Sequence, residues 1–314
     1  MDRVLILGIS SFAGSSFANY LSKNYMFKLF GTYNSIKNIN KLIFKKNNCK
    51  IKLVKIDLSS KKNTLLTVVK NIKPKYIFDF ASVCLVNESW FNPKYYFKVN
   101  VESKIELVQN LHNLKFLKKF IYVSTPEVFG STKHPVKEKE TFFNPTTPYA
   151  ISKLSLEKLL LSYSNFFGSK AIITRFSNFY GRGQLIHRLI PKVLWSIKNN
   201  KKFPIQGTGL SKRDFIFDQD FNSGLAKVLK KGKTGETYHF SNNAYYSIKD
   251  IISLICKIKK VPFKKLVYFT KDRIGKDKNY YLDCKKTTKE LLWKPRIKIQ
   301  EGLKQTIKYY EKVL

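Results

Sequence analysis

The first fifteen residues constrain the fold more than any other part of the chain. The apolar run Arg3-Val-Leu-Ile-Leu7 is typical of a buried parallel strand, and it leads directly into Gly8-Ile-Ser-Ser-Phe-Ala-Gly14. A glycine that closes the strand permits a tight turn, and one six residues later permits close packing of a helix, whose N-terminus then faces a pyrophosphate. Ser11 occupies the middle position, where its hydroxyl could donate to phosphate. We predict a dinucleotide-binding loop with cofactor contacts from Gly8, Ser11, Phe12, Ala13 and Gly14.

The first half of the chain alternates predicted strands and helices. Such alternation favours a parallel sheet covered on both faces, so we predict an α/β fold with a Rossmann-type doubly wound parallel sheet. We expect a cofactor-binding domain at 1–180 and a smaller, mainly substrate-binding α/β region at 181–314, with some segments that return to the main sheet. The predicted strands are Lys28 to Tyr33, Lys52 to Lys55, Tyr76 to Phe80, Lys119 to Val123 and Ala171 to Arg175, and helices begin at Phe12, Leu65, Pro93 and Tyr149.

Residues at the carboxyl ends of these strands are candidates for the rest of the cofactor site. Ligands bind at that edge of a parallel sheet. We expect Asp57 and Leu58 to meet an adenine ring, and Phe80, Ala81 and Ser82 to border the cofactor. Asn100 and Ser124 are assigned to the same site.

The middle of the chain carries a pattern suited to proton transfer. Ser124, Thr125 and Glu127 lie on a loop, and Tyr149 and Lys153 form a Y-x-x-x-K pair. Residues four apart share a helix face, so we expect Lys153 to lie under the Tyr149 ring and favour the phenolate. A tyrosine ordinarily titrates near ~10, and a catalytic base works best near the operating pH. Hydride transfer from an alcohol requires such a base.

The net charge of +38 first indicates a nucleic-acid or membrane-surface partner. However, the lysines are scattered over the whole length, and the abundance of Asn, Ile, Phe and Tyr indicates a coding bias toward A/T-rich codons instead. Arginine is scarce and therefore more informative. Of seven arginines, five lie between residues 175 and 273, and a guanidinium matches phosphate oxygens in pairs. We expect an anionic small-molecule substrate; these arginines are Arg175, Arg182, Arg188, Arg213 and Arg273.

Cysteine usage and hydropathy favour a soluble cytoplasmic protein. The four cysteines, Cys49, Cys84, Cys256 and Cys284, are far apart and have no metal-binding spacing, so we expect reduced structural thiols and neither zinc nor a disulfide. No signal peptide is evident, and no apolar run reaches the ~18 residues of a membrane span.

Six ordered motifs resemble those of extended short-chain dehydrogenase/reductases, and among these the nucleotide-sugar 4,6-dehydratases of the dTDP-glucose type. Besides the nucleotide loop and Y-x-x-x-K, the similar segments are Tyr122-Val-Ser-Thr-Pro-Glu-Val-Phe-Gly130, Arg175-Phe-Ser-Asn-Phe-Tyr-Gly181, Pro204-Ile-Gln-Gly-Thr-Gly209 with Arg213-Asp-Phe-Ile-Phe-Asp218, and Asp272-Arg-Ile-Gly-Lys-Asp277 with Tyr280, Tyr281 and Asp283. The resemblance runs nearly end to end.

The resemblance implies a reaction and roles for the residues. Tyr149 would take the proton of the sugar 4-hydroxyl while hydride leaves C4 for NAD, and Thr125 would hold the 4-oxygen. The 4-ketone acidifies the C5 proton, which Glu127 would remove; water then leaves C6, and the hydride returns there. Substrate contacts are implied for Asn87, Asn178, Arg213 and Arg273. The predicted helices Pro93 to His112 and Tyr149 to Phe167 are long and have apolar faces, so we expect them to pair across a homodimer.

Three departures from the family pattern leave alternatives open. Pro126 replaces the aspartate that protonates the departing 6-hydroxyl, so Glu127 could both take the C5 proton and return it to the C6 oxygen. The segment Gly31-Thr-Tyr-Asn-Ser35 lacks the acid that holds the ribose of NAD, so NADP is not excluded, with Tyr33, Asn34 and Lys37 near a 2′-phosphate. Val86-Asn-Glu-Ser89 replaces V-D-R-S, so the nucleotide or sugar could differ.

The alternatives on the same fold are a nucleotide-sugar 4-epimerase and a UDP-glucuronate decarboxylase. Glu127 after Thr125 argues against a simple epimerase, and the segment around Arg273 argues against the decarboxylase. An inactive relative that binds nucleic acid through its basic surface would require damage at Tyr149 or Lys153, and both are intact.

Overall fold

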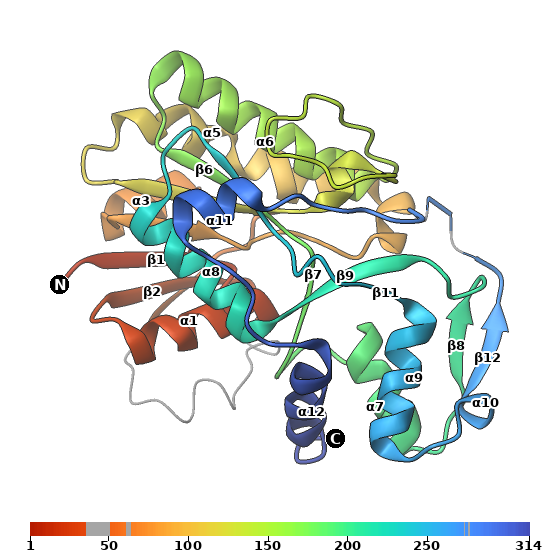
Figure 1. Ribbon diagram of the computed structural model, residues 1–314. Coiled ribbons are helices and arrows are strands. Elements are labelled where there is room, and N and C mark those ends of the chain that lie inside the picture. Colours follow the sequence, from red (N-terminus) through yellow and green to blue (C-terminus); the bar gives the residue numbers. More distant parts are fainter. Residues whose placement is uncertain (36–50, 61–63, 273, 276) are drawn as a thin grey trace.

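A seven-stranded parallel sheet forms the centre of the molecule (Figure 1), in the order β10-β6-β5-β4-β1-β2-β3. The computed structural model describes residues 1–35, 51–60, 64–272, 274–275 and 277–314. The strands are β1 (Arg3–Leu7), β2 (Lys28–Tyr33), β3 (Lys52–Lys55), β4 (Tyr76–Asp79), β5 (Lys119–Ser124), β6 (Ala171–Phe176) and β10 (Thr237–Phe240). The predicted Rossmann-type fold is confirmed. The strand order reverses between β1 and β4, and ligands bind at such a switch point.

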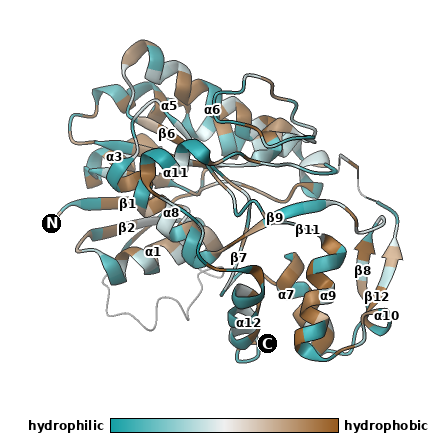
Figure 2. Cartoon of the chain, in the orientation of Figure 1, coloured by the Kyte–Doolittle hydropathy of each residue, from teal (hydrophilic) through white to brown (hydrophobic). Residues whose placement is uncertain are grey.

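Two layers of helices cover the sheet, because alternate residues of each strand face opposite sides. Val4 and Ile6 pack in one core with α1 (Phe12–Asn24), α8 (Asp218–Lys231) and α11 (Lys285–Leu291). Leu5 and Leu7 pack in the other core with α3 (Leu65–Ile72), α5 (Ser103–Asn110) and α6 (Pro148–Phe167). Figure 2 shows the result as helices that carry both hydrophobic and hydrophilic residues.

The chain from Asn178 onward builds a smaller region beside the sheet. Its elements are β7 (Asn178–Tyr180), β9 (Lys212–Phe217) and β11 (Tyr245–Ser247) in one sheet, β8 (Phe203–Gln206) and β12 (Val267–Thr270) in another, and α7 (Leu189–Lys198), α9 (Ile248–Lys259), α10 (Phe263–Leu266) and α12 (Ile299–Tyr310). A third apolar core joins them. However, β10, α8 and α11 return to the main sheet, so residues 181–314 contribute to both parts. The boundary at 180/181 remains a proposal.

The segment predicted as one helix from Pro93 to His112 is interrupted. It consists of α4 (Pro93–Phe97), a π-helical turn η3 (Lys98–Glu102), α5 and a 3₁₀ turn η4 (Leu111–Asn113). A π-helical turn inserts one residue and changes which side chains face inward, which matters for Asn100 below. In contrast, α6 begins at Pro148 and ends at Phe167, as predicted within one residue. Thr147 caps its N-terminus by accepting a hydrogen bond from the Ala150 amide.

A buried charged network attaches α6 to the sheet. The Arg175 guanidinium on β6 donates through Nε and Nη2 to the Glu157 carboxylate on α6, and Nη1 lies 3.0 Å from Nε2 of His239 on β10. The other ring nitrogen of His239 lies 3.1 Å from the Val136 carbonyl oxygen. The Arg175 guanidinium donates to Nε2, and the Val136 carbonyl accepts from Nδ1, so His239 carries one proton, on Nδ1, and is neutral. Burial, and then the charge of Arg175, hold the pKa of His239 well below its ordinary value. Helix α6 is therefore tied to both β6 and β10.

Of the helices that the structure describes, none is both long and apolar enough to cross a membrane.

Candidate active site

The glycine loop after β1 has the geometry of a dinucleotide cradle. Gly8 has φ of +73°, and a Cβ there would lie 2.8 Å from the Ala81 Cα, so the loops after β1 and β4 touch at the switch point. A Cβ on Gly14 would lie 2.5 Å from the Gly8 carbonyl oxygen. Ser11 caps α1 by accepting from the Gly14 amide at 3.0 Å, which leaves its hydroxyl hydrogen to donate. The backbone thus fits the pyrophosphate that the sequence predicts. The Phe12 ring stacks on Phe179 with centroids 4.5 Å apart.

A buried ion pair that sequence reasoning missed fixes the loop after β4. The Lys104 ammonium on α5 lies 2.6 Å from the Asp79 carboxylate and also donates to the Ala81 carbonyl at 2.5 Å. The same carboxylate accepts from the Ala81 amide at 2.9 Å. The Lys104–Asp79 ion pair therefore holds the loop that contains the predicted neighbours of the cofactor, Phe80, Ala81 and Ser82.

Asn100 lies in the π-helical turn and is fully buried. Its amide oxygen accepts from the Val83 amide at 2.9 Å, and its amide nitrogen donates to the Val83 carbonyl at 3.1 Å and to Ser152 Oγ at 3.0 Å. Ser152 in turn donates to the Tyr149 carbonyl at 2.7 Å. In this structure Asn100 therefore connects the loop after β4 with α6; direct contact with the cofactor stays a prediction.

Replacing Ser152 by Ala is expected to weaken cofactor retention, because Asn100 then has a buried donor without a partner, a loss of about 1–3 kcal/mol. The matched control is Ser155→Ala, since Ser155 on the same helix only donates to the Ile151 carbonyl at 3.0 Å. Dissociation of bound NAD from both variants, measured with their melting temperatures, checks this. Equal NAD dissociation rates in the two variants would contradict it.

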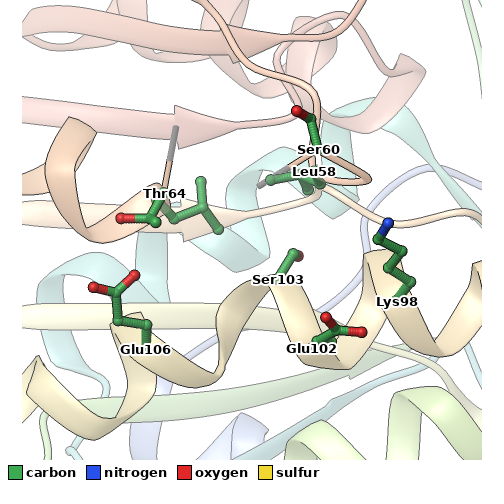
Figure 3. A pocket seen from close by; sticks show the side chains of 8 residues that line it. Leu58, Ser60, Thr64, Lys98, Glu102, Ser103 and Glu106 are labelled. Carbon is green, nitrogen blue, oxygen red and sulfur yellow. The ribbon is translucent and has the colours of Figure 1, made fainter. Parts of the chain in front are cut away.

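The two predicted adenine contacts lie on the loop after β3, and one of them, Leu58, lines a small hollow. Asp57 accepts from the Ser59 amide and hydroxyl at 2.8 and 2.7 Å, and these hydrogen bonds lower the pKa of its carboxyl. Leu58 lines a cavity of about 160 Å³, in which the loop after β3 and the start of α3 face η3 and α5 (Figure 3). The volume is smaller than the roughly 300–1,000 Å³ usual for a ligand pocket. Its other lining residues are Ser60, Thr64, Leu65, Lys98, Glu102, Ser103 and Glu106.

Thr125, Glu127 and Tyr149 gather at the carboxyl end of β5. Thr125 caps the 3₁₀ turn η5 (Pro126–Phe129), its Oγ1 accepting from the Glu127 amide at 3.3 Å. Tyr149 is 8% exposed and hydrogen-bonds the Thr125 side chain. Burial first, and then the charge of Glu127, raise the pKa of Tyr149 well above its ordinary value. The phenol is therefore protonated in the chain alone at neutral pH, ready to donate as well as accept. Ser124, also buried, precedes this cluster.

Lys153 lies on the same buried face of α6. Its ammonium donates to the Val123 carbonyl at 2.8 Å and lies 4.2 Å from the centroid of the Tyr122 ring. Burial, and then the charge of Lys104, lower the pKa of Lys153 to about 7. It thus changes charge near physiological pH. The predicted action of this charge on the Tyr149 ring stays a prediction.

Two further residues belong to this cluster and were not among the predicted catalytic residues. Cys84, predicted as a structural thiol, is only partly buried and interacts electrostatically with Tyr149. Arg188, which enters from the smaller region, donates through Nη2 to Cys84 Sγ at 3.0 Å. For Arg188, the sequence offers one signal, the concentration of arginines between residues 175 and 273. By contrast, Cys256 and Cys284 are buried.

The predicted substrate residues occupy different environments. The Arg213 guanidinium donates to the carbonyls of Lys212, Asp277 and Lys278 at 2.8, 2.7 and 2.9 Å and stacks on Tyr280. Tyr280 donates to Asn178 Oδ1 at 2.6 Å. Here Arg213 therefore fixes the segment near residue 277, and substrate contact by Arg213 and Asn178 stays a prediction. Asn87 is exposed at the start of η2 (Asn87–Trp90). Arg273 and Lys37 lie outside the described residues.

Among the described residues, no group of three His, Cys, Asp or Glu side chains is arranged to hold a metal ion.

The doubly wound sheet, the glycine cradle at its switch point and the Tyr149 cluster together define a short-chain dehydrogenase/reductase of the epimerase/dehydratase type. The chain belongs to the family whose model is described as GDP-mannose 4,6 dehydratase, which matches residues 5–306. It is 30% identical to dTDP-glucose 4,6-dehydratase of Haemophilus influenzae over 343 residues, which cover 99% of this chain and 98% of that protein.

Two solved structures illustrate the range of related enzymes. A dTDP-glucose 4,6-dehydratase from Bacillus anthracis in complex with NAD has a TM-score of 0.88 and 26% identity, covering 99% of this chain and 97% of that one. A UDP-glucuronic acid 4-epimerase from Bacillus cereus, in complex with UDP-glucuronic acid and NAD, has a TM-score of 0.89 and 26% identity, covering 99% of this chain and 100% of that one. The fold therefore serves both reactions, and the site residues must separate them.

Proposed function

We propose that this protein is an NAD-dependent nucleotide-sugar 4,6-dehydratase, which converts a nucleotide-bound hexose to its 4-keto-6-deoxy form. The observation that carries the proposal is the position of Glu127, a carboxylate within electrostatic reach of the Tyr149 hydroxyl. Elimination across C5 and C6 requires such a base in addition to the tyrosine, whereas simple epimerisation does not. Similarity to dTDP-glucose 4,6-dehydratases over nearly the whole chain supports the same reaction.

The chain's own residues divide the proton transfers between them. Tyr149 takes the proton of the sugar 4-hydroxyl, and Thr125, which hydrogen-bonds Tyr149, holds the 4-oxygen in the reactive orientation. Glu127 takes the acidified C5 proton and, because Pro126 has no acid to give, returns it to the departing C6 hydroxyl. Lys153, when protonated, adds a positive charge on the buried face of α6 that favours the Tyr149 phenolate. When bound in the cradle, NAD would supply the hydride acceptor for C4 and the hydride donor for C6, and its positive ring would favour the phenolate. A proton from water would complete C5 once hydride has reached C6.

NAD is the cofactor we assign, in the cradle formed by Gly8, Ser11 and Gly14. The segment Gly31 to Ser35, at the end of β2, has no acidic residue to bind the ribose hydroxyls of NAD. The same preparation is therefore to be tested with NADP. A preference for NADP would correct this assignment while leaving the reaction unchanged.

The experiment that tests the function is incubation of the NAD-loaded chain with dTDP-glucose, CDP-glucose, GDP-mannose, UDP-GlcNAc and UDP-glucuronate, followed by product mass. Loss of one water without net cofactor reduction supports the 4,6-dehydratase and identifies the nucleotide. Unchanged mass with altered stereochemistry would mean an epimerase, and loss of carbon dioxide would mean a decarboxylase.

Replacing Glu127 by Gln is expected to slow elimination at least ~10²-fold, because the amide cannot take the C5 proton. The rate of C4 oxidation should remain measurable. Stopped-flow absorbance of the reduced cofactor, run beside product mass, separates the two steps. The control is Glu140→Gln, at an exposed position after the site loop. Water loss at the normal rate in Glu127→Gln would show that another group is the base.

The homodimer is proposed from apolar side chains left exposed on the α4–α5 segment and α6. Ile105 and Ile151 are 36% and 41% exposed, and Phe166 near the end of α6 is 80% exposed. A second copy that packs these helices against its own would cover them. Ile151→Glu is expected to convert the dimer to a monomer by light scattering, whereas Phe142→Glu, 71% exposed outside these helices, should not. A wild-type monomer at micromolar concentration would contradict the proposal.

A cytoplasmic location is proposed as well. Cys84, Cys256 and Cys284 are free thiols, which suits a reducing compartment. Fractionation of the cells that produce the protein tests it.

A further inference from the structure

Arg188 crosses from the smaller region to the main domain. It is the N-terminal cap residue of α7, yet its Nη2 donates to Cys84 Sγ at 3.0 Å, on the loop after β4. The two residues are 104 positions apart in the sequence. Arg188 thus reaches a thiol that belongs to the cofactor side of the site.

The loop that carries Cys84 is itself fixed. On one side Val83 is held by the Asn100 amide, and on the other the Leu85 carbonyl accepts from the Tyr96 hydroxyl at 2.6 Å. The Tyr96 ring meets the Tyr149 ring edge-on, with centroids 6.5 Å apart. The guanidinium is therefore anchored on a rigid loop beside the catalytic tyrosine.

Several charged or titratable groups face Tyr149, each from a different element. Glu127 on η5 and Cys84 after β4 raise the pKa of Tyr149 together with burial, while Arg188 and the Thr125 hydrogen bond lower it. Tyr96 on α4 lies against the ring, and Tyr122 on β5 interacts with Tyr149 electrostatically. Lys153, one turn along α6, has its ammonium over Tyr122. A positive charge that offsets Glu127 thus comes from outside the Y-x-x-x-K pair.

We propose that Arg188 is a positioning residue for proton transfer: anchored on Cys84, it holds a positive charge beside the Tyr149 hydroxyl and favours the phenolate. A thiol suits this role because it is a weak acceptor that fixes the guanidinium without a carboxylate charge to neutralise it. Since Arg188 comes from the smaller region, the catalytic tyrosine is tuned by how that region meets the main domain. The proposal rests on the proposed function, because it assigns a part in the Tyr149 proton transfer.

The test is a titration that needs no substrate. In the NAD-loaded chain with carbon-13 at tyrosine Cζ, the Tyr149 resonance is assigned by its loss in Tyr149→Phe. Removing a nearby opposite charge in Arg188→Gln is expected to move Tyr149 ionisation upward by about one to two pH units. Cys84→Ser, which keeps an acceptor for the guanidinium, should leave the Tyr149 titration close to that of the wild type. The control is Arg296→Gln, at an exposed arginine.

The pH profile of kcat with the nucleotide sugar that is turned over gives the second readout. The ascending limb of this profile should move to higher pH in Arg188→Gln, while the melting temperature of this variant stays equal to that of the control. If the Tyr149 ionisation in Arg188→Gln occurs at the wild-type pH, the proposal is overturned. A raised KM without a shift of the ascending limb of the kcat profile would also overturn it, because Arg188 would then be a substrate ligand only. If none of the five nucleotide sugars reacts, the proposed function fails, and the titration still decides the role of Arg188.

Discussion

Tyr149→Phe is expected to lower kcat by about 10²–10⁴-fold while leaving the fold and substrate KM nearly unchanged. The substitution removes only the hydroxyl, and the ring keeps its buried position against Tyr96. Tyr149 is protonated in the chain alone, and the positive ring of bound NAD favours its phenolate, so activity of the NAD-loaded protein should rise with pH, and this rise should disappear in the variant. Steady-state kinetics from about pH 6 to pH 9 check this, a range that spans the useful pKa of a base.

The matched control is Tyr96→Phe. Tyr96 is buried beside Tyr149 and loses one hydrogen bond to the Leu85 carbonyl, but we assign it no proton transfer. Its kcat should fall much less, in keeping with the loss of a neutral hydrogen bond of about 1 kcal/mol. Activity of Tyr149→Phe within a few fold of the wild type would show that another group takes the 4-hydroxyl proton.

Arg175→Met is expected to destabilise the protein by about 3–5 kcal/mol, because it leaves the fully buried Glu157 carboxylate without its partner. His239 also loses a neighbour that fixes its tautomer. The free energy of unfolding in urea measures the loss. Glu157, Arg175 and His239 are each at most 1% exposed, so bulk solvent does not reach the Glu157 carboxylate to replace the guanidinium.

The double variant Arg175→Met with Glu157→Leu separates the cost of an unpaired charge from lost packing. Removing both charges should recover much of the stability, because a buried ion pair is often replaceable by apolar side chains. If the double variant is less stable than Arg175→Met alone, the two residues do not act as a pair.

The sequence predicts the sheet and the nucleotide loop well because both depend on local patterns. Apolar runs define the strands, and the left-handed turn at Gly8 and the close approach at Gly14 require glycine at those positions. Strand and helix boundaries differ mostly by one residue, as for β4, β6 and α6.

Three features of the site lie beyond such patterns. The π-helical turn that directs Asn100 inward has no signature in a helical period, which predicts an unbroken helix there. The contact of Arg188 with Cys84 joins distant segments and depends on tertiary packing. The stacking of Arg213 on Tyr280 likewise exists only once the segment near residue 277 has folded back. The contacts of these residues are therefore known only from the structure.

The position of β10 has a consequence for synthesis of the protein. β6 is fully buried and lies between β5 and β10, but β10 is made only after β7, α7, β8, β9 and α8. Chains emerge at about 5–20 residues per second, so a nascent dinucleotide-binding half carries an apolar open edge for several seconds. In that interval β6, already paired with β5 on one side, is an edge strand, and we expect the need for chaperone protection to be greatest then.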